Sequence, residues 1–397
     1  MTRLMGITDV VAGLFGRRRA VPTTATATTA DAGAAAAAIA PRRQPCDPAA
    51  VHTAAELSAF IADGGLGVHC LLDLSRRRWE GSRFARPIAE SPDAAALRSL
   101  RLAHDRLEAA GARQLASSPH LGALVTLDLG GNPLGDAGAR ELAASPHLRA
   151  LQTLDLSGCA LGDEGLSALA ASPILSSVTT LRLSGNVVGP RGLRALLASP
   201  HAGALRQLDL AGNPLGDEGA RILADSPRTA TLESLDLARV RFGAQATWAL
   251  AASPHLSALR ELSLKRNHID GAALRALAGA ALPSLETLVV SHNPLGDEGA
   301  LALAEARLPS LRSLNITKAS VGNAGAVALA RAATLPQLAE LYLGGNRIDT
   351  DGAAALYATR AGSLKLLVLG GNPYDVVEAR RRAALPALTP PASSASG

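Results

Sequence analysis

Aromatic residues are scarce in this chain of 397 residues. Phe, Trp and Tyr together make up 2% of the sequence, although hydrophobic residues reach 48%. A core must therefore be built mainly from Leu, Ala and Val. Small aliphatic side chains spread over so long a chain favour a shallow, repeated core over one deep globular core.

Cysteine is also scarce, and catalytic motifs are lacking. The three cysteines, Cys46, Cys70 and Cys159, lie far apart and are odd in number, which argues against a disulfide framework and a Cys/His metal site. This cysteine usage fits a reducing compartment. The sequence has no HExxH, P-loop or GxSxG motif and no arrangement typical of a catalytic triad. We therefore predict a protein that is not an enzyme and holds no cofactor or metal.

The folded part of the chain has little net charge. The formal charge is +5, and residues 1–50 contribute +3 of it, with six arginines against three aspartates. The remaining residues are close to neutral, so no basic footprint covers them. We predict that nucleic acid is not a partner.

A hydrophobic run long enough to cross a membrane is absent. The apolar segment from Leu4 to Phe15 is interrupted by Asp9 and falls short of the roughly 20 residues that a bilayer requires. Arginines 17–19 follow it, where a signal peptide would have small residues. We expect no transmembrane segment and a cytoplasmic location, with secretion as an effector as the alternative.

The two ends of the chain differ from its middle. Residues 1–46 are rich in Thr, Ala and Pro and are expected to be a disordered or targeting arm, and residues 386–397 a disordered tail. Residues 47–96 are expected to hold a capping helix, starting at Asp47-Pro48 and ending at Gly64-Gly65, and a degenerate repeat. That weak repeat contains Leu72, Leu74 and Trp79.

Between these ends, residues 97–385 repeat one string eleven times. The string is LxxLxLxxN with a further apolar residue two positions on, and successive copies start 27 residues apart six times, then 26, 26, 27 and 26. A fixed period of this length is typical of a solenoid, in which each unit buries its apolar face against its neighbours. The copies begin at Leu97, Leu124, Leu151, Val178, Leu205, Leu232, Leu259, Leu285, Leu311, Leu338 and Leu364.

Each unit has the pattern of a strand, a turn and a helix. The leucines alternate over residues 124–129, as in a strand, and take a helical spacing over residues 134–142. A proline in the recurring phrase Ser-Pro-His ends several helices, because Pro cannot continue one. The predicted helix N-caps are Asp136, Asp163, Asp217 and Asp297.

The recurring Asn follows the strand of most units. Its amide can bond backbone groups of its own turn and of the next one, so we interpret it as structural. Cys159, Val240 and Ala319 replace it in three units, where the ladder is expected to be weaker. The residues are Asn132, Asn186, Asn213, Asn267, Asn293, Asn346 and Asn372.

These units resemble leucine-rich repeats over residues 97–374. Their length and full helix resemble the ribonuclease-inhibitor-like subclass, and the phrases NPLGDEGA and LAASPHL resemble bacterial arrays of that kind. The resemblance implies a right-handed α/β solenoid, or horseshoe, with parallel strands on the concave face and helices on the convex face. It also implies a scaffold that binds a partner protein through the concave face.

Other members of the repeat class suggest alternatives. The segments 299–304 and 325–330 resemble the GALA repeats of secreted bacterial effectors, which pair them with an F-box. No convincing F-box precedes Leu97. A secreted effector or ubiquitin-ligase adaptor is therefore the alternative function, and a GTPase-activator-like regulator, as in Ran GTPase-activating proteins, is a third.

Function is expected at the third, fifth, seventh and eighth residues of each unit, which point away from the core. The fifth-residue column is acidic in its first half, with Arg182 between two pairs of aspartates. Like charges on neighbouring strands destabilise a sheet. Two interpretations stay open, a solvated column compensated by Arg182 or a groove for a basic partner. The aspartates are Asp128, Asp155, Asp209 and Asp236.

The second half of the concave face is basic and carries an aromatic residue, Tyr342, which is expected to be exposed. Tyr and Arg are frequent at binding hot spots, so we predict that the partner of a monomeric protein binds here. The alternative interpretation is a mixed polar surface. The predicted contact residues are Arg239, Arg241, Lys265, Arg266, His268, His292, Asn315, Lys318, Tyr342 and Arg347.

Two further sets of residues are expected to have no ligand. One histidine per unit occupies the same return loop, roughly a repeat from the next, which disfavours a metal site. These are His120, His147, His201 and His255. Trp79 and Trp248 fall where apolar core residues are expected and are interpreted as packing residues.

Overall fold

In the computed structural model, residues 53–65, 70–77, 81–332, 337–359 and 364–384 are described. All of them belong to one compact unit, residues 45–397. The predicted arm and tail, Asp47-Pro48 and Trp79 lie outside the described residues. The prediction that the capping helix starts at Asp47-Pro48 is wrong, because Thr53 is extended and caps a helix that starts at Ala54.

Twelve parallel strands pair in chain order in a single sheet. Every strand has three residues, and the pairing follows the predicted steps from β2 onward, with Ser99 opposite Thr126 and Thr126 opposite Thr153. One strand, β1, precedes the eleven predicted units. It belongs to the degenerate repeat, and its Leu72 lies opposite Leu100. The strands are β1 Leu71–Asp73, β2 Ser99–Arg101, β3 Thr126–Asp128, β4 Thr153–Asp155, β5 Thr180–Arg182, β6 Gln207–Asp209, β7 Ser234–Asp236, β8 Glu261–Ser263, β9 Thr287–Val289, β10 Ser313–Asn315, β11 Glu340–Tyr342 and β12 Leu366–Val368.

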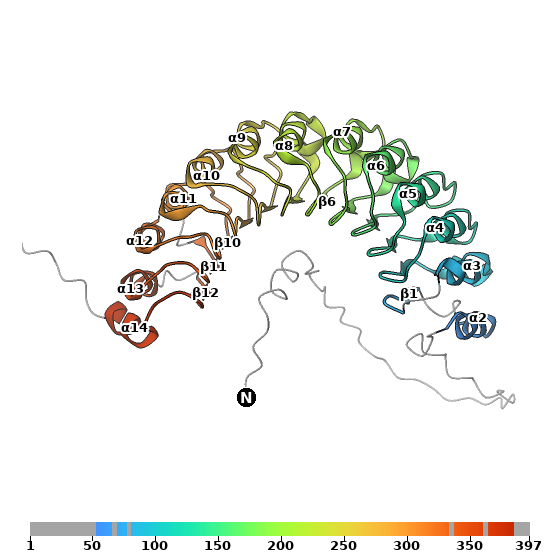
Figure 1. Cartoon of the computed structure of the whole chain (residues 1–397), viewed down its shortest axis with the longest axis horizontal. Coiled ribbons are helices and arrows are strands. Elements are labelled where there is room, and N and C mark those ends of the chain that lie inside the picture. Colours follow the sequence, from blue (N-terminus) through green and yellow to red (C-terminus); the bar gives the residue numbers. More distant parts are fainter. Residues whose placement is uncertain (1–52, 66–69, 78–80, 333–336, 360–363, 385–397) are drawn as a thin grey trace, which may run out of the picture. The chain divides into compact units, whose positions relative to one another are not determined.

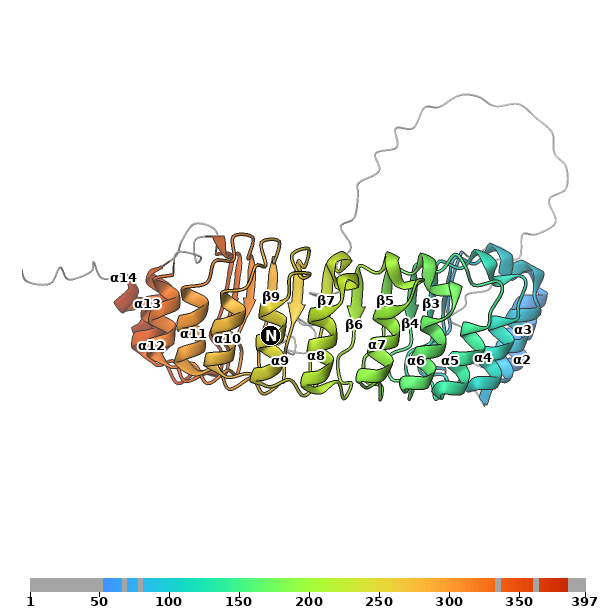
Figure 2. The same ribbon diagram turned by 90° about the horizontal axis from the view of Figure 1, so that it is seen from above.

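A helix follows almost every strand, and within this unit the helices line one side of the sheet (Figure 1; Figure 2). The strands lie along the inner side of the arc and the helices along the outer side, as predicted for a leucine-rich repeat solenoid. The helices are α2 Ala54–Ala62, α3 Ala85–Glu90, α4 Ala109–Ala116, α5 Gly135–Ala143, α6 Asp163–Ala170, α7 Pro190–Ala198, α8 Gly216–Asp225, α9 Ala244–Ala252, α10 Gly271–Ala278, α11 Gly296–Ala304, α12 Asn323–Ala330, α13 Thr350–Ala358 and α14 Val376–Ala384.

The core is one continuous layer between strands and helices. Leu124, Leu127 and Leu129 of one unit are each at most 1% exposed, as are the equivalent leucines of the next unit. Short 3₁₀ turns return the chain from several helices to the sheet. At the N-terminal end, Thr53 caps α2 in a capping box with Glu56, and Leu57 and Phe60 are buried.

The predicted Asn ladder is confirmed, but each Asn bonds its own turn and the preceding unit, and the expected bond to the next unit is wrong. Asn132 Nδ2 donates to the carbonyl oxygens of Leu102, one unit earlier, and Leu129, in its own unit, at 2.7 and 2.8 Å. Its Oδ1 accepts the N–H groups of Asp105 and Leu107. The side chain is fully buried, so it satisfies four backbone groups that water cannot reach. Cys159 retains part of this role, because its Sγ donates to Leu129 O at 3.2 Å.

The predicted N-caps are wrong in one respect. Asp136 lies inside its helix, and Asp163 is the first residue of its own. Asp136 Oδ1 instead accepts N–H groups of the following unit, from Gly162 at 2.7 Å and Gly165 at 2.9 Å. The residue thus caps the next helix, and a single sequence cannot show that the helix it caps belongs to another unit. The other predicted caps do the same: Asp163 bonds Gly189 and Gly192, Asp217 bonds Gly243, and Asp297 bonds Gly322 and Gly325.

A serine ladder joins the other ends of the helices. Ser145, in the Ser-Pro-His phrase, donates through Oγ to Ala116 O, near the end of the preceding helix, at 2.5 Å. Ser253 donates to Ala224 O at 2.7 Å in the same way. These serines satisfy helix carbonyls that have no partner within the helix.

No helix in the described part of the chain is both long and apolar enough to span a bilayer.

We predict that replacing Asn213 by Leu destabilises the fold. Its Nδ2 bonds Leu183 O and Leu210 O, and its Oδ1 bonds Val188 N, so the change leaves three buried backbone groups unpaired. The free energy of unfolding should fall by about 1–3 kcal/mol in denaturant titrations. Asn213→Cys is the matched control and should lose less, because Cys159 holds this position elsewhere. Unchanged unfolding of Asn213→Leu would contradict the ladder.

Candidate functional site

The turn after each strand places the eighth residue of the unit in the left-handed conformation, and some turns hold a second such residue further on, as at Arg241 with φ +64°. In the unit of β8 it is Arg266, with φ +56°, whose N–H donates to Ser291 O of the next unit at 2.9 Å. Equivalent bonds link Gly158 N to Ser184 O and Gly185 N to Ala211 O. The same position recurs in each turn along the array. Glycine occupies it at Gly131, Gly158, Gly185, Gly212, Gly345 and Gly371, and other residues at Arg76, His104, Arg239, Arg266, His292 and Lys318.

Four consecutive units therefore place Arg239, Arg266, His292 and Lys318 where glycine is the unstrained choice. A residue with a Cβ costs roughly 1–2 kcal/mol in this conformation. Strain of this kind collects at functional sites, where another requirement outweighs stability. The repeat fold does not demand cations here, because glycine fills the same turn in the units on both sides.

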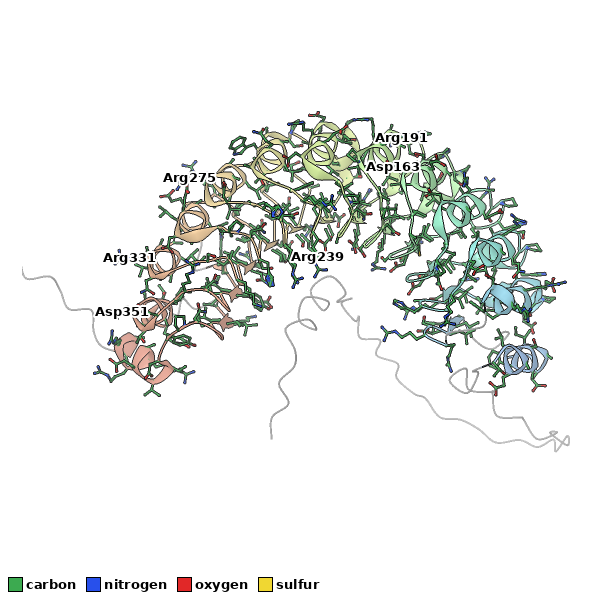
Figure 3. All side chains as sticks on the ribbon, in the orientation of Figure 1. Asp163, Arg191, Arg239, Arg275, Arg331 and Asp351 are labelled. Carbon is green, nitrogen blue, oxygen red and sulfur yellow. The ribbon has the colours of Figure 1, made fainter. Side chains whose placement is uncertain are left out.

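Lys265 joins these four residues to form what we call the basic row. It occupies the seventh position of its unit, where neighbouring units have Ala238 and Ser291. Arg239, Arg266 and Lys318 are exposed, and Lys265 and His292 are half-buried. Figure 3 shows Arg239 on the inner side of the arc, whereas Arg275 and Arg331 lie on the helix side.

The cations of the basic row form no ion pairs within the described part of the chain. Several arginines elsewhere are paired between units, such as Arg113 with Glu141 at 2.6 Å and Arg260 with Glu286 at 2.5 Å. Unpaired like charges on adjacent strands repel each other. The basic row thus combines strain with repulsion.

Electrostatic coupling shows that the row is a cluster. Partial burial lowers the pKa of His292, and Arg266, Lys265, Lys318 and Arg239 lower it further. Burial also lowers the pKa of Lys265, with contributions from Arg266 and Arg239. All five side chains therefore act on one region of the concave face.

The other predicted contact residues are not part of this cluster. Arg241, His268 and Arg347 are exposed, but each lies two residues further along its turn, beyond a buried residue of the ladder. Asn315 and Tyr342 lie on the strands and are only 6% and 7% exposed.

The expectation that Tyr342 is exposed is wrong. The residue lies between Asn315 and Val368 of the neighbouring strands, and its hydroxyl bonds the Glu340 carboxylate at 3.2 Å. Trp248 was expected in the core and is instead 45% exposed. Helix α9 buries Ala246, Thr247 and Leu250, which leaves Trp248 on its outer side.

The four aspartates of the fifth-residue column, which we call the acidic column, have a local structural role. Asp128 Oδ1 accepts the N–H of Gly130 at 3.0 Å, and Asp209 Oδ1 that of Ala211 at 2.9 Å, so the carboxylates close the turns after their strands. Asp155 and Asp236 do the same for Ser157 and Ala238. Arg182 lies near Asp155, with Nη1 3.9 Å from Oδ2. This supports the interpretation of a compensated column.

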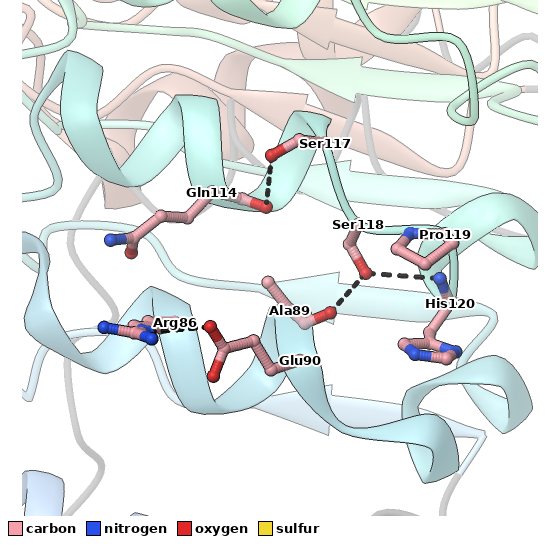
Figure 4. A pocket seen from close by; sticks show the side chains of 8 residues that line it. All are labelled: Arg86, Ala89, Glu90, Gln114, Ser117, Ser118, Pro119 and His120. Atoms are coloured by element: carbon pink, nitrogen blue, oxygen red, sulfur yellow. Dashed lines mark hydrogen bonds and ion pairs between the residues drawn. The ribbon is translucent and has the colours of Figure 1, made fainter.

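Two hollows lie near the N-terminal end of the array. One, of about 550 Å³, opens on the concave face over the small residues Gly130, Gly131, Ser157 and Gly158, beside Asp128. The other, of about 420 Å³, lies at the ends of α3 and α4 (Figure 4). Figure 4 shows Ser118 Oγ bonded to Ala89 O and His120 N in its wall, which is a step of the serine ladder. Ser118 in this wall therefore serves the fold.

No group of three or more metal-ligating side chains occurs among the residues that the structure describes. The one cysteine of the ladder, Cys159, is buried, and burial raises the pKa of its thiol to about 12. It is not a reactive thiolate at neutral pH.

Family models identify the repeats. The model for FBD-associated F-box protein leucine-rich repeats matches residues 193–367, and a general leucine-rich repeat model matches residues 124–143, 147–170 and 175–197. No curated protein matches the chain. The chain is a leucine-rich repeat protein. The matches do not assign the ribonuclease-inhibitor-like subclass.

The solved structures that match this chain share little sequence with it. Mouse RP105, in a complex with MD-1, is 18% identical, with a TM-score of 0.49 over 80% of this chain and 49% of that chain. An internalin from Listeria monocytogenes is 16% identical, with a TM-score of 0.48 over 83% and 92%. The Arabidopsis receptor kinase HAESA ectodomain, in complex with a peptide hormone, is 18% identical, with a TM-score of 0.45 over 76% and 46%. The chain spans about half the length of the RP105 and HAESA chains.

We predict that Arg266→Gly stabilises the protein by about 1 kcal/mol, because it removes left-handed strain and one repelling charge. Gly185→Arg is the matched control at the equivalent position. A Cβ there would lie 3.8 Å from its nearest neighbours, so the cost comes from the conformation, φ +68°, and the variant should be destabilised. Denaturant unfolding measures both. A destabilised Arg266→Gly protein would contradict the strain argument.

Asp209 should make stability depend on pH. Burial, and then the charge of Asp236 on the neighbouring strand, raise the pKa of Asp209 to about 6. A raised pKa means that protonation favours the folded state, so this contribution is full below pH 4 and is lost as the pH rises through 6. In the wild-type protein, Asp209 should cause the melting temperature to fall between pH 5 and 7.5. This fall should be smaller in Asp209→Asn. Parallel curves for the two proteins would disprove this.

Proposed function

We propose that this leucine-rich repeat protein is a binding scaffold that recognises an acidic region of a partner protein through the basic row. The observation that carries the proposal is the replacement of glycine by Arg239, Arg266, His292 and Lys318 in four consecutive turns. These residues cost stability and have no acidic partners within the described chain. A bound acidic segment would supply the missing countercharges.

The extent of the site follows from the turns around it. Gly212 precedes the basic row and Gly345 follows it, so the cations end sharply on both sides. Lys318 extends toward the next unit, where a Cβ on Gly345 would come within 2.8 Å of Lys318 Cγ. Glycine at position 345 therefore leaves room for the lysine side chain. Two of the three lysines in the sequence, Lys265 and Lys318, lie in this row.

A second candidate site is the acidic column, which would take a basic partner. The hollow of about 550 Å³ beside Asp128 and Asp155 favours it. The turn bonds of these aspartates account for their presence without a ligand, whereas glycine would fill the turns of the basic row without strain.

A role as a ubiquitin-ligase adaptor is a second candidate function. The match to the repeats of an F-box protein family favours it. That match covers repeats alone, so it supports recognition of a partner and leaves the recruiting surface of such an adaptor unassigned.

Simple polymers test which face binds. We predict that fluorescently labelled poly-glutamate binds the wild-type protein, and that Lys265→Glu with Arg266→Glu reduces its affinity on the order of a hundredfold, as expected for two reversed charges at a site. Arg241→Glu with Arg347→Glu changes the net charge equally outside the row and is the matched control. It should have a small effect.

The acidic column gives the opposite pattern. The proposal fails, and the column is the site, if three results occur together. Poly-lysine binds the wild-type protein, poly-glutamate does not, and Asp155→Lys with Asp209→Lys abolishes the binding of poly-lysine. Anisotropy titrations at fixed, low ionic strength distinguish the two, because exposed charges are screened by salt.

A further inference from the structure

We propose that the acidic segment is an α-helix that lies along the basic row, across strands β7 to β10. This inference rests on the proposed function and specifies the partner's structure. It depends on the spacing of the cations, their direction along the array and the charges at the ends of the row.

The spacing favours a helix. Arg239, Arg266, His292 and Lys318 occupy the same position in successive units. Adjacent strands lie about 4.8 Å apart, so the four residues span about 14 Å at the backbone. Acidic side chains at positions i, i+3, i+7 and i+10 of a helix lie on one face and span about 15 Å.

An extended segment fits the row poorly. Side chains on one face of a strand repeat every 6.6–6.8 Å, so four of them span about 20 Å. The spans of the acidic side chains and of the cations would differ by about 6 Å over the whole row. A strand could satisfy two or three cations, whereas a helix can satisfy all four and reach Lys265 beside Arg266.

The ends of the row set the length and direction of the ligand. Asp236 lies in the first unit of the row and Asp209 in the unit before it, and the charge of Asp236 partly offsets the lowering of the Lys265 pKa. On the C-terminal side the turns continue with Gly345 and Gly371. About three helical turns therefore fit. The positive N-terminal end of the helix dipole would lie toward Asp236, and its negative C-terminal end toward Lys318.

The same boundaries disfavour nucleic acid. A phosphate backbone carries charge continuously and would extend past the row on both sides. It would meet the carboxylates of Asp209 and Asp236 at one end and uncharged glycine turns at the other. An acidic face of limited length avoids both.

Three labelled peptides of about 15 residues test the inference. The first is alanine-rich with glutamates at i, i+3, i+7 and i+10. The second has the same glutamates but two prolines at intervening positions, which break the helix. The third has four glutamates at alternate positions in a strand-forming sequence. Anisotropy gives affinities for the wild-type protein, and circular dichroism reports helix formation on binding.

The helical peptide should bind on the order of tenfold tighter than either of the others, equivalent to about 1.4 kcal/mol. Its affinity should fall in Lys265→Glu with Arg266→Glu and hold in Arg241→Glu with Arg347→Glu. Equal binding of the proline peptide, or tighter binding of the strand peptide, would overturn the helix while leaving the basic row as the site. A duplex DNA of equal charge that binds tighter would also overturn it.

Failure of the proposed function gives a separate result. None of the three peptides, nor poly-glutamate, would then bind the wild-type protein, or all would bind the Lys265→Glu, Arg266→Glu variant as well as the wild type.

Discussion

Every unit of this protein depends on its neighbours to satisfy its backbone. Strands of three residues have little stability alone, and the turns around them bury N–H and C=O groups that water cannot reach. Three ladders resolve this from unit to unit: Asn132 and its equivalents within the turns, Asp136 and its equivalents at helix starts, and Ser145 and its equivalents at helix ends. The fold therefore depends on side-chain-to-backbone bonds between units as well as on the leucine core.

The same constraint explains why the basic row is informative. Each turn needs a left-handed residue so that its N–H can reach the next unit, as from Arg239 N to Lys265 O at 2.9 Å. Glycine meets this need without strain. Arg239, Arg266, His292 and Lys318 meet it at a cost that the repeat architecture does not require. The acidic column differs, because its aspartates accept the N–H groups of their own turns.

The architecture could be predicted from the sequence because the spacing of the leucines determines the register between neighbouring strands. All eleven predicted units appear, together with the degenerate repeat around Leu72. Side-chain roles that cross between units were harder: Asp136 looks like the cap of its own helix, and only the structure shows that it caps the next. Exposure was misjudged at Tyr342, where neighbouring strands cover the side chain, and at Trp248, which helix α9 turns outward. The left-handed position could have been found by aligning the units, because glycine changes to Arg, Arg, His and Lys in a single column.

We propose that the basic row serves binding at the expense of stability. The most direct measurement is on one variant in which Arg239, Arg266, His292 and Lys318 are all replaced by glycine, with unfolding and the affinity for a helical acidic peptide measured on the same preparation. We expect a higher free energy of unfolding together with loss of binding. A variant that is less stable than the wild type, or that binds the peptide unchanged, would contradict it.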